Sequence, residues 1–196
     1  MTSKRLTVFA SGTGSNFISL HQSVQKGIIP ATITAFITDK PGCSARSYAK
    51  EHNITDYVLR PADFDSHDGY VKKLLSVLEE ETPDLILLAG YLKKIPDEVI
   101  RRYPKKILNI HPSLLPLYGG KGWYGHKVHH AVIENGDIES GCTIHYVTEV
   151  YDDGPIIAQR KVPVFPEDHP DSLAKRVLKE EHTLYTEVVK RLLEQS

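Results

Sequence analysis

Residues 85–89 (LILLA) form a uniformly apolar run, which narrows the choice of folds more than any other feature of the sequence. A strand with one face in water alternates apolar and polar residues, whereas a strand covered on both faces is apolar throughout. A stripe of apolar residues at helical spacing over 67–81 precedes the run, and Pro83 and Asp84 separate the two. The run therefore predicts an inner strand of a sheet with helices on both faces.

Segments of strand and helix character alternate along the first half of the chain. Apolar runs predict strands at 6–10, 31–37, 56–59, 85–89 and 107–110, and helical patterns predict helices at 17–24, 43–52 and 67–81. This order is typical of βαβ units, which build a parallel sheet.

The second half of the chain has a different pattern. Runs at 143–147 and 156–164 alternate more and lie close together, which predicts antiparallel or mixed strands. Apolar residues at helical spacing over 173–193 predict a long final helix. The sequence thus predicts one domain over 1–196 with an α/β fold. Its sheet is Rossmann-like, mainly parallel and flanked by helices, with a mixed or antiparallel C-terminal part.

Composition narrows the class of protein. Lys and Arg total 24 and Asp and Glu total 25, so the formal charge of −1 gives no support to a nucleic-acid partner. The first apolar segment is too short for a signal peptide, and no stretch approaches the roughly 20 apolar residues of a membrane span. The two cysteines, Cys43 and Cys142, form no CxxC pair, which fits a reducing compartment. We predict a cytoplasmic protein with small-molecule substrates and neither a nucleic-acid nor a membrane partner.

A glycine-rich turn at 11–16 (SGTGSN) follows the first expected strand and opens a helix. Glycines let the backbone come close to a ligand, and the free N–H groups of a helix start attract an anion. The turn lacks the Lys-Ser/Thr pair of a P-loop and the third glycine of the dinucleotide fingerprint. A single phosphomonoester therefore fits better than a dinucleotide. The alternative is a turn capped by Ser15 that binds nothing.

Asn109 and His111 lie at the end of the buried strand that 107–110 predicts. Residues two apart on a strand share a face, and open α/β sheets bind ligands at the carboxyl ends of their strands. An amide N–H stabilises an oxyanion, and an imidazole exchanges a proton near pH 7. The pair therefore predicts one reaction site, with a strand end that merely contains a satisfied histidine as the alternative.

An acidic turn at 151–155 (YDDGP) joins the last two expected strands. Asp-Gly-Pro is typical of a turn, and a turn alone would explain the pattern. In the second interpretation one aspartate reaches His111, where a carboxylate would raise the histidine pKa and orient the ring. Spacing along the chain leaves both interpretations open.

A loop at 119–125 (GGKGWYG) combines four glycines with two aromatic residues, which fits either a mobile lid or an irregular loop. His126, His129 and His130 follow it, in or near an expected helix. They lack the glutamate of a HExxH zinc motif, so we predict no metal site.

Several motifs together resemble the folate-dependent formyltransferases. They are SGTGSN at 11–16, LAGYLKKI at 88–95, LNIHPSLLP at 108–116, YDDGP at 151–155 and EEHTLY at 180–185. The resemblance covers about residues 5–193, and SGTGSN points to the group that formylates glycinamide ribonucleotide. It implies the formyltransferase fold and 10-formyltetrahydrofolate as the donor, with no metal. We expect a monomer or homodimer.

The resemblance also implies roles for individual residues. The catalytic residues would be Asn109, protonated His111 and Asp152, with Asp152 keeping His111 charged. The ribonucleotide would contact Gly14, Ser15, Asn16, Lys179 and Glu181. The folate would contact His67, Leu92, Lys93, Lys94, Ile95, Asn109, Thr148, Glu149, Val150 and Tyr151.

Some features depart from the family pattern. The stretch after Pro116 is longer than in compact relatives, and Asp153 replaces the first glycine of the acidic turn. Leu178 stands where a polar or basic residue is common, while Lys179 should face about 100° away on the helix. His67 and Lys93 stand where arginines often meet the glutamate tail of the folate, and lysine lacks the bidentate fork of arginine.

Four other functions fit parts of the sequence. A formyltetrahydrofolate hydrolase would use the same histidine and aspartate to activate water, and a methionyl-tRNA formyltransferase shares the HPSLLP motif. Both usually carry an added domain, for which residues 1–196 leave no room. A sugar-nucleotide formyltransferase needs no turn tuned to one phosphomonoester. A catalytically inactive sensor of phosphate ligands would not need Asn109, His111 and Asp152 together.

Overall fold

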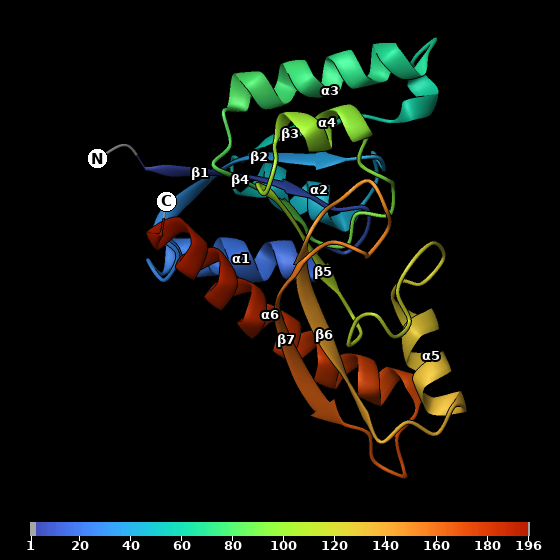
Figure 1. Cartoon of the computed structure of the whole chain (residues 1–196). Helices are drawn as coiled ribbons and strands as arrows, with labels where there is room; N and C mark the ends of the chain where they lie inside the picture. The colour runs from blue at the N-terminus through green and yellow to red at the C-terminus, as the bar shows by residue number, and fades with distance from the viewer. Residues whose placement is uncertain (1–2, 196) are drawn as a thin grey trace.

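The strands form a single seven-stranded sheet with the strand order β3-β2-β1-β4-β5-β6-β7 (Figure 1). The computed structural model describes residues 3–195. The strands are β1 (Lys4–Phe9), β2 (Ala31–Thr38), β3 (Thr55–Val58), β4 (Leu85–Leu88), β5 (Ile107–His111), β6 (Glu139–Tyr146) and β7 (Ile156–Pro163). The helices are α1 (Ser15–Gln25), α2 (Ser44–Glu51), α3 (His67–Glu81), α4 (Asp97–Arg102), α5 (His126–Glu134) and α6 (Pro170–Glu194), with a 3-10 turn η1 (Pro61–Asp63).

The predicted fold class is confirmed. Strands β1 to β5 pair in parallel, and β6 and β7 are antiparallel to their neighbours. Two elements differ from the prediction. Helix α4 was not expected, because its six residues bury only Val99 and so show no apolar stripe. Strand β6 begins at Glu139 rather than 143, because residues 140–145 are buried on both faces and do not alternate.

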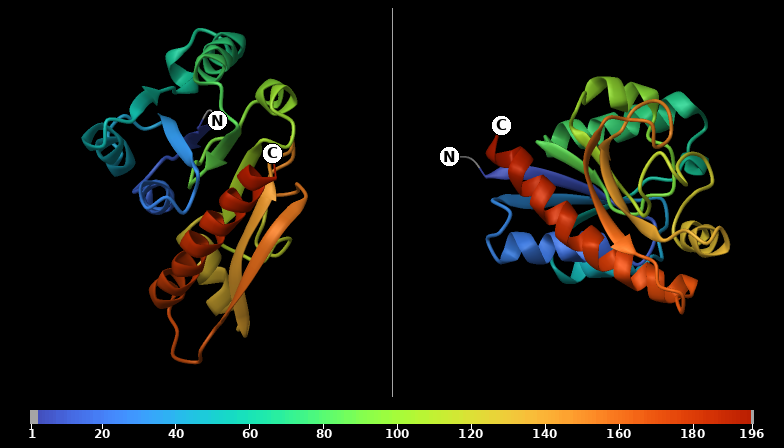
Figure 2. Two further views of the ribbon diagram at one scale, coloured as in Figure 1. Left: turned by 90° about the vertical axis from the view of Figure 1, so that its left-hand side faces the viewer. Right: turned by 60° about the horizontal axis from the view of Figure 1, so that its bottom comes forward.

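Two helical layers enclose the sheet (Figures 1 and 2). Leu85 and Leu87 of β4 pack with side chains of α1, α2, α5 and α6. Ile86 and Leu88 pack on the other face, against α3 and α4. The apolar run at 85–89 is therefore covered on both sides, as its composition predicts.

The last helix crosses the C-terminal part of the sheet (Figure 2). The predicted stripe of α6 is buried except at its margin, where Leu192 is half-buried. Tyr185 lies wholly inside the core, and its hydroxyl is within 3.3 Å of the Leu88 carbonyl and 3.2 Å of the Leu108 carbonyl. These contacts tie α6 to the last residue of β4 and to the first part of β5.

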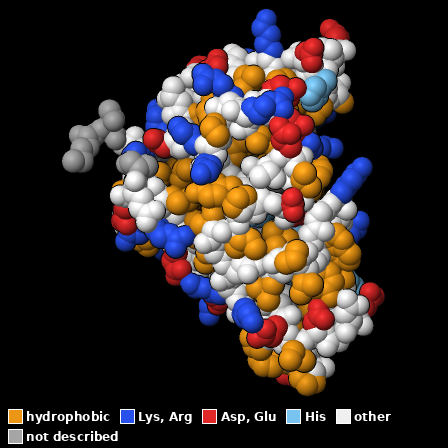
Figure 3. Space-filling model, in the orientation of Figure 1, with side chains coloured by type: hydrophobic (Ala, Val, Ile, Leu, Met, Phe, Trp, Pro, Cys, Tyr) orange, Lys and Arg blue, Asp and Glu red, His pale blue; other side chains and the backbone are white. Residues whose placement is uncertain are grey.

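Charged side chains of both signs lie close together on the surface of α3 and α4 (Figure 3). Arg101 of α4 pairs with Glu149 at 2.7 Å, and Lys94 pairs with Asp97 at 2.7 Å. The first of these pairs links α4 to the segment between β6 and β7. Within residues 3–195 we find no helix with the length and apolar content that a bilayer span requires.

Asp168, just before α6, supports a prediction about stability. Its carboxylate accepts hydrogen bonds from Arg176 at 2.6 and 2.9 Å, from Ser172 at 2.6 Å and from the Phe165 N–H at 2.8 Å. Mainly through the Arg176 bond, these donors hold the pKa of Asp168 well below its usual range. We expect Asp168→Asn to lower the free energy of unfolding at pH 7 by roughly 1–3 kcal/mol.

The pH dependence of this effect follows from the sign of the shift. A carboxyl whose pKa is lower in the folded state stabilises the fold above its unfolded pKa of about 3.9, and this contribution is lost as the pH falls toward the folded value. Urea unfolding of both proteins should therefore show a smaller difference at pH 3 than at pH 7. An equal difference at both pH values would contradict this account.

Candidate active site

A cleft of about 750 Å³ opens at the carboxyl ends of β1, β4 and β5. Its walls come from five segments: the glycine-rich turn, the stretch after β4, the end of β5, the loop after Tyr118 and the segment between β6 and β7. Helix α6 adds Ala174, Leu178 and Glu181. The site therefore lies where open α/β sheets bind their ligands.

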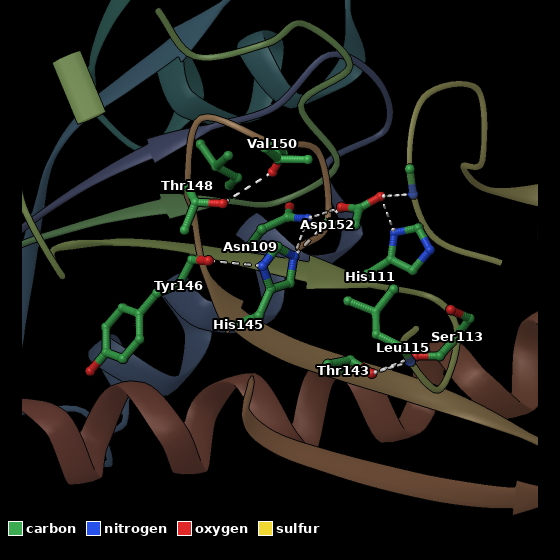
Figure 4. A network of polar contacts seen from close by, with 12 residues as sticks. Asn109, His111, Ser113, Leu115, Thr143, His145, Tyr146, Thr148, Val150 and Asp152 are labelled. Carbon is green, nitrogen blue, oxygen red and sulfur yellow. Dashed lines mark hydrogen bonds and ion pairs between the residues drawn. The ribbon is translucent and has the colours of Figure 1, made fainter. Parts of the chain in front are cut away.

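Four polar side chains converge at the centre of this cleft (Figure 4). Asn109 and His111 come from β5, His145 from β6 and Asp152 from the acidic turn. The His111 Nδ1 lies 3.5 Å from one Asp152 oxygen. The other Asp152 oxygen is 3.6 Å from His145 Nε2 and accepts from the Asn109 amide at 3.4 Å. The second interpretation of the acidic turn is thus correct in its geometry, and the aspartate that reaches His111 is Asp152, while Asp153 is exposed.

The electrostatics of His111 differ from expectation. Burial lowers the histidine pKa, and the raising effects of Asp152 and of the Tyr118 carbonyl do not cancel it. Asp152 does raise the pKa of His111, as expected, but in the unliganded site the loss of water outweighs this effect. His111 Nε2 donates to the Tyr118 carbonyl at 2.7 Å, so Nδ1 faces Asp152.

Asp152 itself is held ionised. Burial would raise its pKa, but His145, the charge of His111 and the Gly120 N–H together lower the pKa below its usual value. The Gly120 N–H donates to Asp152 Oδ2 at 2.9 Å. An ionised carboxylate at this place is ready to accept a proton or to stabilise a cation.

The loop at 119–125 takes part in the site. Gly120 bonds to Asp152, and the Tyr118 carbonyl accepts from His111. Tyr118 adopts a left-handed backbone with φ 52°, and its hydroxyl donates to Asp137 at 2.5 Å. Trp123 and Tyr124 line the cleft. The loop is thus hydrogen-bonded to Asp152 and His111. That it moves as a lid stays a prediction.

His145 and Tyr118 are site residues that sequence reasoning missed. His145 lies directly opposite Asn109 in the β5–β6 ladder, and its Nε2 is 3.1 Å from the Asn109 amide nitrogen. The histidine within the expected strand at 143–147 was the available signal. Its use required the register of the two strands, which the residues alone do not supply.

The glycine-rich turn lies at one end of the cleft. Gly14 has φ 74°, and a Cβ there would lie 2.5 Å from the Ala45 Cβ, so both conformation and space require glycine. Asn16 donates to Glu181 Oε2 at 2.7 Å, which joins the start of α1 to α6. Burial raises the pKa of Glu181, and the Asn16 bond opposes this shift in part.

Most of the residues predicted to contact the folate line the cleft. Leu92, Lys93, Lys94, Ile95, Thr148, Val150 and Tyr151 line it. The Leu92 N–H donates to Ser11 Oγ at 3.0 Å, which fixes this wall against the glycine-rich turn.

Four predicted binding residues, Gly14, His67, Glu149 and Lys179, lie outside the cleft lining. His67 stands at the start of α3 with Glu98 4.0 Å away, and Glu149 points to Arg101. Lys179 is exposed on α6, whereas its neighbour Leu178 faces the cleft, as the helical rotation requires. Within residues 3–195, no group of three His, Cys, Asp or Glu side chains is arranged to hold a metal ion.

Comparison with known proteins identifies the family. Residues 4–189 match the family described as formyl transferase. Phosphoribosylglycinamide formyltransferase of Escherichia coli is 34% identical over 184 residues, covering 94% of this chain and 84% of that protein. The chloroplastic enzyme of the same name from Arabidopsis thaliana is 48% identical over 193 residues, covering 98% of this chain and 66% of that protein. A second plant relative, from Vigna unguiculata, is covered over 62% of its length, so the chain spans slightly less than two thirds of these plant proteins.

Solved structures agree with these sequence relatives. Phosphoribosylglycinamide formyltransferase from Bacillus halodurans has a TM-score of 0.90 at 36% identity, covering 97% of this chain and 95% of that one. Glycinamide ribonucleotide transformylase 1 from Geobacillus kaustophilus has a TM-score of 0.90 at 38% identity, covering 98% of this chain and 100% of that one. This chain therefore belongs to the formyl transferase family, within its phosphoribosylglycinamide formyltransferase group.

Proposed function

We propose that this protein transfers the formyl group of 10-formyltetrahydrofolate to the amine of glycinamide ribonucleotide. The products are N-formylglycinamide ribonucleotide and tetrahydrofolate, a step of purine biosynthesis. One observation carries the proposal: Asn109, His111 and Asp152 meet at the centre of a cleft that also contains the glycine-rich turn and Glu181. The relatives named above carry the same activity in their names.

The lining of the cleft offers a separate set of residues for each of the two substrates. The turn at 11–16 and Glu181 would hold the phosphate and ribose of the acceptor at one end. The wall after β4 and the segment 148–151 would hold the folate at the other. The reacting amine and formyl carbon then meet beside Asn109 and His111, and proximity of this kind contributes a large part of catalysis.

The reaction begins when the acceptor amine attacks the formyl carbon and an oxyanion forms. The Asn109 amide donates to that oxygen, and so does His111 once it is protonated. The negative charge that develops beside His111 raises its affinity for a proton, which offsets the effect of burial. A new nitrogen–carbon bond forms, the bond from the formyl carbon to folate N10 breaks, and one proton passes from the amine to N10. Ionised Asp152 accepts and returns that proton, directly or through a water molecule.

Hydrolysis of the formyl donor is the second candidate. A formyltetrahydrofolate deformylase from Pseudomonas syringae has a TM-score of 0.87 at 25% identity, covering 99% of this chain and 62% of that one. In that reaction a water molecule would take the place of the amine at the same histidine and aspartate. The glycine-rich turn and its Asn16–Glu181 contact favour a phosphorylated acceptor over water.

An assay of donor turnover separates the two functions. We expect tetrahydrofolate release from 10-formyltetrahydrofolate to require glycinamide ribonucleotide, with the formyl group recovered on the acceptor amine. Equal release without the ribonucleotide would identify a hydrolase. Binding of both ligands without turnover would indicate a sensor and overturn the proposal.

Three further expectations accompany this proposed function. We propose that turnover needs no metal, so an excess of chelator should leave the rate unchanged. A monomer or homodimer is expected in solution, which sedimentation would measure. A cytoplasmic location stays a prediction, and the plant relatives carry the word chloroplastic in their names.

A further inference from the structure

One ammonium group beside the glycine-rich turn has no role in the site described so far. Lys40 follows β2 and lines the cleft together with Gly12 and Thr13. Two contacts tie its segment to the turn. Ser11 Oγ donates to Asp39 Oδ1 at 2.5 Å, and the Ala45 N–H donates to the Gly12 carbonyl at 3.2 Å. Lys40 therefore lies on a stretch that is bonded to the turn on both sides.

The backbone of Lys40 is held in place. Its N–H donates to Thr38 Oγ1 at 3.1 Å, and its carbonyl accepts from the Cys43 N–H at 3.2 Å. Pro41 follows and restricts Lys40 to extended conformations. Only the side chain has to be ordered when a ligand binds, which keeps the entropic cost small.

A phosphate bound at this end of the cleft would carry more negative charge than the helix start can balance. A phosphomonoester carries about −1.5 to −2 charges at pH 7, whereas a helix start offers about half a positive charge. The turn at 11–16 has no charged side chain. Helix α6 presents Leu178 and the carboxyl of Glu181, and Lys179 is outside the lining.

The other lysines of the cleft come from elsewhere. Lys93 and Lys94 follow β4, and Lys94 is paired with Asp97. Lys121 lies on the loop whose Gly120 bonds to Asp152 at the centre of the site. Lys40 forms no ion pair with any residue in the range 3–195, so its charge is available to a ligand.

We propose that Lys40 binds the phosphate of the acceptor and supplies the positive charge that the cleft-lining residues of α6 do not provide. The inference rests on the proposed function, because it takes the acceptor to be a phosphorylated ribose derivative. The phosphate takes no part in bond making or breaking. Its contact with Lys40 is equal in the ground state and the transition state, so Lys40 sets KM rather than kcat.

The test compares two acceptors and two variants. With glycinamide ribonucleotide, we expect Lys40→Gln to raise KM roughly tenfold, the value of one hydrogen bond to a charged group, with kcat and the donor KM unchanged. With the riboside that lacks the phosphate, Lys40→Gln should leave KM unchanged. Lys40→Arg keeps the charge and should retain most of the affinity.

Two matched controls use lysines at other positions. Lys175→Gln, on the exposed face of α6, and Lys121→Gln, on the loop, should both leave the KM ratio of the two acceptors unchanged. The proposal is overturned if Lys40→Gln affects both acceptors equally or neither. It is also overturned if Lys175→Gln or Lys121→Gln causes the selective loss instead.

A binding measurement separates this inference from the proposed function. Titration calorimetry with ribose 5-phosphate and with ribose needs no turnover. We expect the phosphate to strengthen binding to the wild-type protein and Lys40→Gln to remove most of that gain. Absence of turnover together with this result would reject the formyl transfer and keep Lys40 as a phosphate ligand. Equal binding of both sugars by the wild-type protein would reject the Lys40 site.

Discussion

Asp152→Asn is expected to lower kcat by at least about 100-fold while the fold stays intact. Loss of one group that stabilises the charge of a tetrahedral intermediate costs about 10²–10³ in rate, and Asp152 contacts both Asn109 and His111. Asparagine has nearly the same shape and still accepts from the Gly120 N–H, but it carries no charge and accepts no proton. Steady-state turnover with both substrates and the thermal midpoint of each protein are the measurements.

Asp153→Asn provides the matched control for this experiment. Asp153 is the next residue in the same turn and is exposed. It should keep wild-type kcat, because its carboxylate lies outside the cluster. Wild-type turnover by Asp152→Asn, or a greater loss in Asp153→Asn, would remove Asp152 from the catalytic set.

Gly154→Ala is expected to destabilise the protein strongly and to reduce activity with it. A Cβ at Gly154 would lie 1.7 Å from the Tyr146 carbonyl oxygen and 2.8 Å from its carbon, and neither backbone atom can move aside cheaply. Tyr146 in turn bonds through its N–H to the Pro155 carbonyl at 3.0 Å, so the whole turn must open. We expect a loss of about 3 kcal/mol in the free energy of unfolding, near the upper end for overpacking.

Urea unfolding at pH 7 measures this loss, and kcat measures the displacement of Asp152 two residues away. Gly42→Ala is the control for stability, because a Cβ there would meet no atom within 4 Å. The two variants should differ by most of the expected 3 kcal/mol. Similar stabilities would mean that the turn accommodates a side chain at position 154, so that steric crowding is not the reason for a glycine there.

Local patterns predicted the order and type of most elements. The run at 85–89 became β4 with both faces covered, and the stripe at 67–81 became α3. Periodicity works for these segments because each one buries a face or a whole strand. Helix α4 was not predicted because it buries only Val99 and therefore shows no apolar stripe.

The location of the site could also be predicted from the amino-acid sequence. Asn109, His111 and the turn at 11–16 follow strands, and carboxyl ends of parallel strands meet at one edge of a sheet. The choice of Asp152 over Asp153 as the partner of His111 rested on the family resemblance. The contact itself is visible only in the folded protein. His145 depended on the β5–β6 register, which places it opposite Asn109.

Apolar periodicity and strand order are properties of neighbouring residues, so the amino-acid sequence was enough to predict the layered α/β fold and the chemical groups at the strand ends. Which of these groups meet, and how they titrate, depends on the folded structure. Asn16 and Glu181 are 165 residues apart yet bonded, and burial lowers the pKa of His111 despite Asp152 beside it. Contact between distant residues and loss of water both depend on how the whole chain packs, and no local pattern records either of them.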